Sequence, residues 1–466
     1  MEKEWNDRIE QYFSDHRQEI IDTLFALARI PSVQGAPVEG KPYGQAVADV
    51  LDKALALCEE QGLETENIGY YCGSARYGSA EKELGFIAHL DVVPAGDGWS
   101  GKPFEPFLRD GYAIGRGVRD NKNGAVCGLF AIRCIKELGI PMRHALRLIF
   151  GCAEETGMDD LPHYLEKHAA PSFSIVPDTS FPVCHGEKGI YTADLLLPIG
   201  PEVLGFEGGI ASNVVPDKAE ICLRTSAPAA GSPAAGEHVR LEAGDGTLRL
   251  LANGITAHAS QPQHSISAIY ELASALCRAP ELCSEKTLKS MTFLRDMLSD
   301  CYGERLGIAA SDEPSGKLTC ICGLVRLEEG AVRMNLNIRY PVTYSGEKIT
   351  EGLRRTAQEN GMELANIHDD HPNFLPGDLP AVQRLTRIYN EATGRSLPPY
   401  VMGGGTYARH LPNAVAFGPD DPEEAVPCPP GHGSAHEPDE CQSIRGLLEA
   451  AKIYVRALIE LDAVID

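Results

Sequence analysis

Short apolar runs alternate with helical segments between residues 84 and 180 of this chain. The runs LGFIAHLD, ALRLIFGCAEE and FSIVPDTS have the length and composition of buried strands, and GAVCGLFAIRCIKELGI and LPHYLEKHA between them have helical periodicity. An Asp-Gly turn at 110–111 predicts a β-hairpin after the first run. This order of elements predicts an α/β fold with a mostly parallel sheet.

The pattern changes between about Gly189 and His371, where strand-like stretches such as YTADLLLPI and VRMNLNIRYPV alternate with helical segments. With 466 residues, the chain also exceeds the size at which a single hydrophobic core stops growing. We therefore predict a discontinuous first domain, residues 1–188 and 372–466, and an inserted α+β domain, residues 189–371. Within the insertion, the stretch APAAGSPAAG at 227–236 predicts a flexible segment.

The charge balance narrows the classes of partner. The chain has 42 Lys and Arg residues and 66 Asp and Glu residues, and the resulting net charge of -24 disfavours binding to nucleic acid and to anionic lipid. No stretch has the roughly 18 apolar residues of a membrane helix, and the first residues contain no apolar signal region. The 14 cysteines include no CxxC pair. We expect a cytoplasmic protein with reduced thiols that binds neither nucleic acid nor membranes.

Candidate metal ligands follow the predicted strands and the hairpin. In an open α/β sheet, binding sites form outside the carboxyl ends of the strands, so positions far apart in sequence converge there. Each of these residues alone could be a turn, a helix cap or a solvated acid. The candidates are His89, Asp120, Glu154, Glu155 and Asp178. A single metal site explains their shared positions better than capping does.

Asp91 stands two residues after His89, and in an extended chain both side chains point to the same side. A metal-bound imidazole needs its second N–H held, and the Asp91 carboxylate could hold it. The alternative is a buried His-Asp pair without a metal. Glu154 and Glu155 are neighbours whose side chains diverge in extended backbone, so they can perform different tasks.

A series of motifs resembles the M20 metallopeptidase family over nearly the whole chain. HLDVVPAGDGW, GRGVRDNKNG, AEETG, VPDTS and HEPDE occur in the order of the family's metal motifs. GEKG, SNVVPD, GITAHAS and GGGTYAR are similar to the PepV-like dipeptidase branch of that family. The resemblance implies a metal-binding catalytic domain in the first and last parts of the chain, with the insertion as a lid that binds substrate.

The resemblance also implies two divalent metal ions, zinc first, with manganese or cobalt as alternatives. Asp120 would bridge both ions, and a cis peptide bond between Asp120 and Asn121 would orient its carboxylate. His89 and Asp178 would complete one metal site. The other site would be completed by Glu155 and by His436, which is preferred to His432 because HEPDE has the His-x-x-Asp-Glu form of the family.

The remaining roles come from the same resemblance. Glu154 would be the general base that assists attack by a metal-activated hydroxide, and Asp91, which orients His89, would be a further catalytic residue. His258 in GITAHAS would stabilise the oxyanion, although by itself it could be a loop histidine. Contacts to the substrate would come from further residues, each of which could also be a surface or turn residue: Arg339, Asn213, Gly404 and Thr406.

These expectations lead to one hypothesis and two alternatives. The hypothesis is a two-metal dipeptidase of the metallopeptidase class, which cleaves dipeptides or short peptides and acts as a monomer because its long insertion supplies the lid. One alternative is a deacylase or desuccinylase that acts on N-acyl amino acids with the same metal motifs. The other is a non-catalytic relative that binds metal or peptide.

Overall fold

The computed structural model describes residues 3–225 and 232–466, so residues 227–231 of the predicted flexible segment lie outside the described residues. The chain divides into two compact units. Unit 1 comprises Met1–His185, Leu375–Tyr400 and Thr406–Asp466, and unit 2 comprises Gly186–Phe374 and Val401–Gly405. The sequence places the domain boundaries after residues 188 and 371, and the structure divides the chain after His185 and Phe374.

The structure assigns residues 401–405 to a different domain from the one that the sequence predicts. The sequence assigns this segment to the first domain, whereas the structure groups it with unit 2. The reason is hydrogen bonding, because the carbonyl of Met402 accepts from the amide of Lys188 at 2.9 Å. The carbonyl of Gly403 accepts from the Arg339 guanidinium at 3.1 Å.

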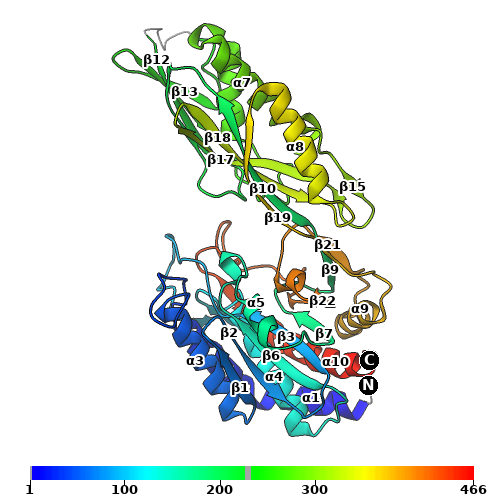
Figure 1. Cartoon of the computed structure of the whole chain (residues 1–466). Coiled ribbons are helices and arrows are strands. Elements are labelled where there is room, and N and C mark those ends of the chain that lie inside the picture. Colours follow the sequence, from blue (N-terminus) through cyan, green and yellow to red (C-terminus); the bar gives the residue numbers. More distant parts are fainter. Residues whose placement is uncertain (1–2, 226–231) are drawn as a thin grey trace. The chain divides into compact units, whose positions relative to one another are not determined.

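A mixed sheet forms the centre of unit 1 (Figure 1). Its strands, in spatial order, are β1 (Glu64–Ile68), β2 (Cys72–Tyr77), β6 (Ala145–Gly151), β3 (Glu83–His89), β7 (Phe173–Val176), β22 (Ala414–Ala416) and β9 (Cys184–Glu187). The central strands β6, β3, β7 and β22 pair in parallel, and the outer pairs are antiparallel. Nearly every residue of β3 and β6 is buried, as expected for parallel strands covered on both faces. The predicted parallel sheet is therefore confirmed for its central strands.

Helices surround this sheet in unit 1, some in contact with its strands and others packed on those helices. They are α1 (Lys3–Asp15), α2 (Arg17–Ala28), α3 (Gln45–Glu60), α4 (Lys122–Leu138), α5 (Leu161–Lys167), α9 (Pro380–Thr393) and α10 (Ile444–Asp462). Helix α4 packs closely on β3, since a Cβ atom at Gly128 would lie 2.5 Å from the Phe86 ring. Because α4 begins at Lys122, the close packing fixes the position of Asp120 just before it.

The predicted hairpin is confirmed by β4 (Phe107–Arg109) and β5 (Tyr112–Ile114). Asp110 and Gly111 both have positive φ angles, of 51° and 85°, as a tight hairpin turn requires. The short strand β24 (Cys441–Ser443) pairs with β5. This pairing, which the sequence pattern did not indicate, brings the HEPDE segment to the hairpin that precedes Asp120.

Unit 2 is built on an antiparallel sheet (Figure 1). Its strands, in spatial order, are β13 (Val239–Ala243), β14 (Thr247–Asn253), β12 (Lys218–Arg224), β11 (Val203–Gly208), β17 (Thr319–Glu328), β18 (Ala331–Tyr340), β10 (Gly189–Pro198) and β19 (Glu363–Asp370). Helices α6 (Ala268–Arg278), α7 (Glu285–Met297) and α8 (Gly346–Asn360) cover one face. In β18, Met334, Leu336 and Ile338 join this core, and the alternating side chains at 335, 337 and 339 are polar. The predicted α+β character is confirmed.

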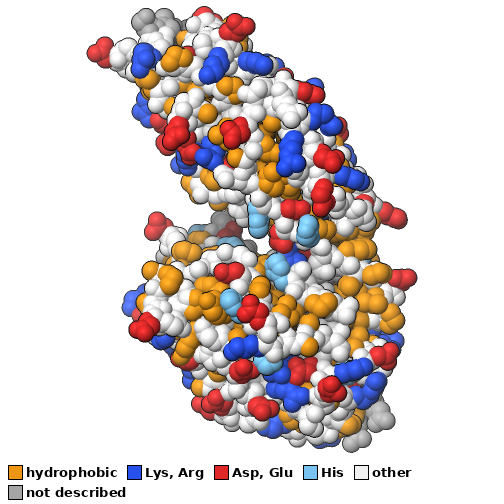
Figure 2. All heavy atoms as spheres, in the orientation of Figure 1, with side chains coloured by type: hydrophobic (Ala, Val, Ile, Leu, Met, Phe, Trp, Pro, Cys, Tyr) orange, Lys and Arg blue, Asp and Glu red, His pale blue; other side chains and the backbone are white. Residues whose placement is uncertain are grey.

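The surface carries charges of both signs. On the face shown in Figure 2, acidic and basic side chains are interspersed within each unit, with no broad basic area on that face. Across residues 3–225 and 232–466, no helix is both long enough and apolar enough to cross a membrane.

Candidate metal centre

Most candidate ligands of unit 1 stand at or just after the carboxyl ends of the parallel strands, and Asp120 stands just before a helix. His89 is the last residue of β3, and Asp178 comes two residues after the end of β7. Glu154 and Glu155 open a short 3-10 helix, Glu154–Thr156, just after β6. Asp120 immediately precedes the first residues of α4. The sheet therefore brings together side chains that the sequence separates by up to about ninety positions.

Asp120 lies at the centre of the cluster. Its Oδ1 is 3.0 Å from Nε2 of His89, and its Oδ2 is 3.0 Å from Nε2 of His436. The same nitrogen of His436 is 3.1 Å from Oε2 of Glu155, and Nε2 of His89 is 3.8 Å from Oδ1 of Asp178. The two oxygens of one carboxylate thus face two different histidines, which is the arrangement that a bridging ligand requires.

His432 occupies a different place. Its Nδ1 lies 3.0 Å from Oδ2 of Asp439, and that carboxylate also accepts hydrogen bonds from the amide and hydroxyl of Ser100. His432 therefore helps to order the loop that carries His436.

The donor set fits divalent cations. His89, Glu154 and Asp178 offer ligand atoms within 4.8 Å of one another, and so do His89, Asp120 and Glu155. Metal-ligand bonds of about 2 Å can span donor atoms at such separations. Imidazole nitrogens and carboxylate oxygens suit zinc and manganese. These residues could therefore hold two such ions.

The electrostatics of the cluster agree with this. Burial and the neighbouring negative charges raise the pKa values of Glu155 and Asp178 above their ordinary range. Burial, together with the charge on Asp178, raises the pKa of Glu154 well above its ordinary value. Burial opposes ionisation of Asp120 too, but hydrogen bonds from His436 and His89 hold the pKa of Asp120 well below its usual range. Cations placed among these carboxylates would relieve the repulsion between them.

Asp91 has a wider role than the sequence indicates. Nδ1 of His89 lies 3.0 Å from the backbone carbonyl of Asp91 and 3.4 Å from its carboxylate. The carboxylate also accepts hydrogen bonds from the amides of Glu154, at 3.2 Å, and Glu155, at 3.1 Å. Asp91 therefore orients the His89 ring and at the same time holds the backbone of both glutamates.

The peptide bond between Asp120 and Asn121 is cis, as predicted. The side-chain Nδ2 of Asn121 donates to the backbone carbonyl of Pro177 and, at 3.1 Å, to Oδ1 of Asp178. Asn121 thus links the segment of one candidate ligand, Asp120, to that of another, Asp178.

The proposed oxyanion histidine belongs to unit 2. The Ser260 amide donates to Nδ1 of His258 at 3.2 Å, and the Ser260 hydroxyl lies 2.8 Å from the same nitrogen. Since an amide can only donate, Nδ1 accepts, and the neutral ring carries its proton on Nε2. The carbonyl of Asn213 accepts from the amide of Ala259 at 2.8 Å, so Asn213 and His258 stand in adjoining segments.

Arg339 is also held within unit 2. Its Nε donates to Oδ1 of Asn337 at 3.0 Å, and one terminal nitrogen donates to the carbonyl of Gly403. A Cβ atom at Gly403 would lie 2.6 Å from Cβ of Ser260, so the glycine turn that includes Gly404 packs against the His258 segment. These predicted substrate contacts therefore gather within one unit.

Thr406 is placed differently from these residues. It belongs to unit 1 and is buried. Its hydroxyl accepts from the amide of Ala408 at 3.1 Å and caps the short helix Tyr407–His410. Its side chain thus has a structural contact that the substrate-binding expectation did not include.

The comparisons with known proteins agree with this geometry. The model of the peptidase family M20/M25/M40 matches residues 85–460, well over half of the chain. The chain belongs to the M20 peptidase family. The putative dipeptidase YtjP of Bacillus subtilis is 31% identical over 463 residues, covering 96% of this chain and 97% of that protein. The putative dipeptidase SH1171 of Staphylococcus haemolyticus is 27% identical over 479 residues, covering 98% of this chain and 99% of that protein.

Solved structures share the M20 fold with this chain. Human carnosine dipeptidase 1 has a TM-score of 0.58 and 15% identity, covering 98% of this chain and 100% of that chain. The di-peptidase Dug1p of Saccharomyces cerevisiae has a TM-score of 0.60 and 14% identity, with 98% of each chain covered. At these identities the likeness concerns the fold.

Sequence reasoning missed a buried ion pair beside the candidate ligands of this M20 peptidase. Arg116 and Glu440 lie 2.6 Å apart, with side chains 1% and 0% exposed. The other oxygen of Glu440 accepts from the amides of Arg119, at 2.9 Å, and Asp120, at 3.2 Å. Arg116 also donates to the carbonyl of His436 at 3.3 Å. Both residues stand inside the M20-like motifs GRGVRDNKNG and HEPDE, which was the available signal.

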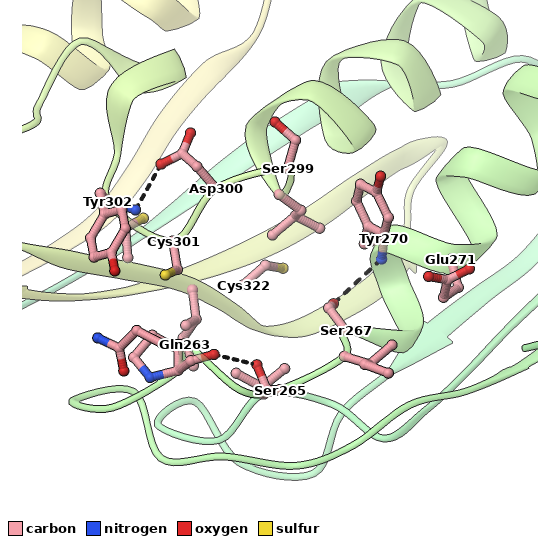
Figure 3. A pocket seen from close by; sticks show the side chains of 16 residues that line it. Gln263, Ser265, Ser267, Tyr270, Glu271, Ser299, Asp300, Cys301, Tyr302 and Cys322 are labelled. Carbon is pink, nitrogen blue, oxygen red and sulfur yellow. Dashed lines mark hydrogen bonds between the residues drawn. The ribbon is translucent and has the colours of Figure 1, made fainter.

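A cavity of about 500 Å³ lies in unit 2, and its lining residues are far in the sequence from the candidate metal ligands. Figure 3 shows Tyr270, Cys301, Tyr302 and Cys322 among the side chains that line it. Val215 and Ile321 also line it and form a small apolar cluster with Ala259, the residue after His258. The candidate metal ligands belong to unit 1, whereas the residues lining this cavity belong to unit 2.

Proposed function

We propose that this M20 peptidase is a two-metal dipeptidase that cleaves dipeptides or short peptides. The observation that carries the proposal is the Asp120 carboxylate, whose two oxygens each lie 3.0 Å from a different histidine, His89 and His436. Bound divalent ions would supply Lewis acidity and would make water a nucleophile at neutral pH. The curated relatives named as putative dipeptidases, matched over almost their full length, support the same activity.

Glu154 moves the proton in this proposal. It takes a proton from the attacking water and delivers it to the leaving amine. It is placed for this task, because Glu154 offers a carboxylate oxygen within 4.8 Å of donor atoms of the candidate ligands His89 and Asp178. The bond from its amide to the Asp91 carboxylate fixes the backbone from which it acts.

Unit 2 binds the substrate in this proposal. Arg339 presents a planar guanidinium, held by Asn337 and Gly403, to the carboxylate of the substrate. His258 donates its Nε2 proton to the oxyanion, and a donor of this kind lowers the activation barrier by about 3–4 kcal/mol. Asn213 and Gly404 contact the peptide. Because His258 and Arg339 come from the same unit of the same chain, we propose an active monomer.

The native ion and the compartment belong to the proposal as well. We propose zinc, with manganese or cobalt as alternatives, because the donors are imidazole and carboxylate. All fourteen cysteines lie in the described residues and are thiols rather than disulfide partners, which supports a reducing, cytoplasmic environment.

A substrate panel tests the proposal. Protein stripped of metal and reloaded with zinc, manganese or cobalt is assayed on dipeptides and on N-acyl amino acids. We expect dipeptides to be the faster substrates and the metal-free protein to be inactive. Faster hydrolysis of N-acyl amino acids would instead identify a deacylase or desuccinylase. Metal binding without any hydrolysis would identify a non-catalytic relative.

A further inference from the structure

Two buried carboxylates hold the loop that carries Glu154 and Glu155. The amides of Cys152 and Ala153 donate to Oδ2 of Asp160 at 2.5 and 3.1 Å. The next two amides, at 154 and 155, donate to Asp91 at 3.2 and 3.1 Å. Every backbone N–H from 152 to 155 therefore points at one of two carboxylates. The proposed catalytic roles account for Asp91, and Asp160 needs an explanation of its own.

Tyr407 completes the surroundings of Asp160. Its hydroxyl donates to the same Oδ2 of Asp160 at 2.5 Å, and the amide of Leu161 donates to Oδ1 at 2.8 Å. Asp160 and Tyr407 are both 0% exposed. A hydrogen bond to a charged group in such a buried setting is strong, and its loss leaves the remaining partner poorly solvated.

The packing of Tyr407 is equally specific. Its ring lies over Gly151, the last residue of β6, where a Cβ atom would come within 1.9 Å of the Tyr407 hydroxyl oxygen. Tyr407 also comes just after the point where the chain passes from unit 2, which ends at Gly405, to unit 1, which resumes at Thr406. Tyr407 thus contacts the end of β6 directly and the loop at 152–155 through Asp160, and it stands next to the residue at which unit 1 resumes.

We propose that Asp160 and Tyr407 form a clamp that positions Glu154 and Glu155 in the metal centre. The clamp acts through the backbone of residues 152 and 153, so Asp160 and Tyr407 are positioning residues. Its effect on turnover rests on the proposed function, whereas its effect on metal affinity does not. In the alternative interpretation, Asp160 and Tyr407 are a buried polar pair that stabilises the fold without affecting the metal centre.

The chain offers a matched control for Tyr407→Phe. Tyr43 is buried, at 4% exposure, and its hydroxyl donates to Oδ1 of Asp159 at 2.7 Å. Asp159 is the neighbour of Asp160, but the amides of 152–155 donate to Asp160 and Asp91 instead. Tyr43→Phe therefore removes the hydroxyl of a buried tyrosine, bonded here to an exposed carboxylate, without removing a hydrogen bond of the clamp.

The experiment compares wild type, Tyr407→Phe and Tyr43→Phe by thermal unfolding, by zinc affinity of the metal-free protein in a chelator competition, and by kcat and KM on a dipeptide. We expect Tyr407→Phe to lower kcat by about 10- to 100-fold with KM nearly unchanged, since a displaced catalytic group costs rate more than binding. We expect it to weaken zinc binding by about 10-fold, because Glu155 shifts with the loop. Tyr43→Phe should lower only the unfolding temperature.

The double variant and the comparison of the two tyrosine variants test whether the clamp positions the metal ligands. Asp160→Asn combined with Tyr407→Phe should reduce zinc affinity by less than the product of the single effects, because both changes release the same loop. If Asp160→Asn does not fold, Tyr407→Phe still decides. Equal loss of stability in the two tyrosine variants, with kcat and zinc affinity as in wild type, would overturn the clamp. If wild type cleaves no dipeptide, the proposed function fails, and the zinc affinities still test the clamp.

Discussion

Replacing Glu440 with glutamine should destabilise the protein far more than the loss of an ordinary ion pair. Glu440 is fully buried and binds Arg116 at 2.6 Å through one oxygen. Its other oxygen accepts the amides of Arg119 and Asp120. In Glu440→Gln, the new NH₂ group must face either the guanidinium or these amides, so donors oppose donors on one side.

The expected magnitude follows from burial. Removing the charge of one partner leaves Arg116 as a buried, uncompensated cation, and this costs about 3–5 kcal/mol. Arg116 would keep its long contacts, at 3.3 Å, to the carbonyls of Ala95 and His436 and its position 5.2 Å from the centre of the Trp99 ring, none of which carries a full negative charge. Because Glu440 and Arg116 contact the backbone of Asp120 and His436, zinc affinity should fall as well.

The assay is urea unfolding of the metal-free protein, with Glu105→Gln as the control. Glu105 pairs with Lys102 at the same distance, 2.6 Å, but these side chains are 67% and 75% exposed. The control should lose no more than about 1 kcal/mol of unfolding free energy. If Glu440→Gln loses no more than Glu105→Gln, burial does not govern the strength of this pair and the reasoning fails.

Three further predictions test the proposed site. Glu154→Gln should keep its metal and lose turnover by at least about 100-fold, because an amide cannot carry the proton; near-normal activity at full metal occupancy would assign the base elsewhere. His436→Ala should weaken metal binding strongly, whereas His432→Ala should nearly retain it, as measured by zinc titration; the reverse order would exchange their roles. A mixture of His258→Ala and Glu154→Gln chains should stay inactive, and recovered activity in a rate assay would mean that subunits share the site.

The sequence predicts the central sheet well, and it also indicates the candidate ligands at the strand ends, because both depend on local patterns. β3 and β6 appear as continuous apolar runs, with His89 as the last residue of β3 and Glu155 in the short helix that follows β6. His436 has no such signal, since it lies in an irregular loop with a positive φ of 65°. Only the HEPDE motif indicated it.

The supporting contacts could not be predicted in the same way. Arg116 and Glu440 are 324 positions apart, and Asp160 and Tyr407 are 247 apart. No periodicity relates residues at such separations, so their pairing depends on the finished fold. The Asp91 carboxylate is an intermediate case. Its partnership with His89 follows from spacing, whereas its bonds to the amides of Glu154 and Glu155 depend on two neighbouring strands.

The ratio of metal to protein tests the central claim most directly. Protein stripped of metal is reloaded with zinc, desalted and measured by plasma mass spectrometry, together with Asp120→Ala treated in the same way. The account predicts two zinc ions per wild-type chain and fewer than one per Asp120→Ala chain, because both ions share this carboxylate. One ion per wild-type chain, or two ions retained by Asp120→Ala, would contradict it.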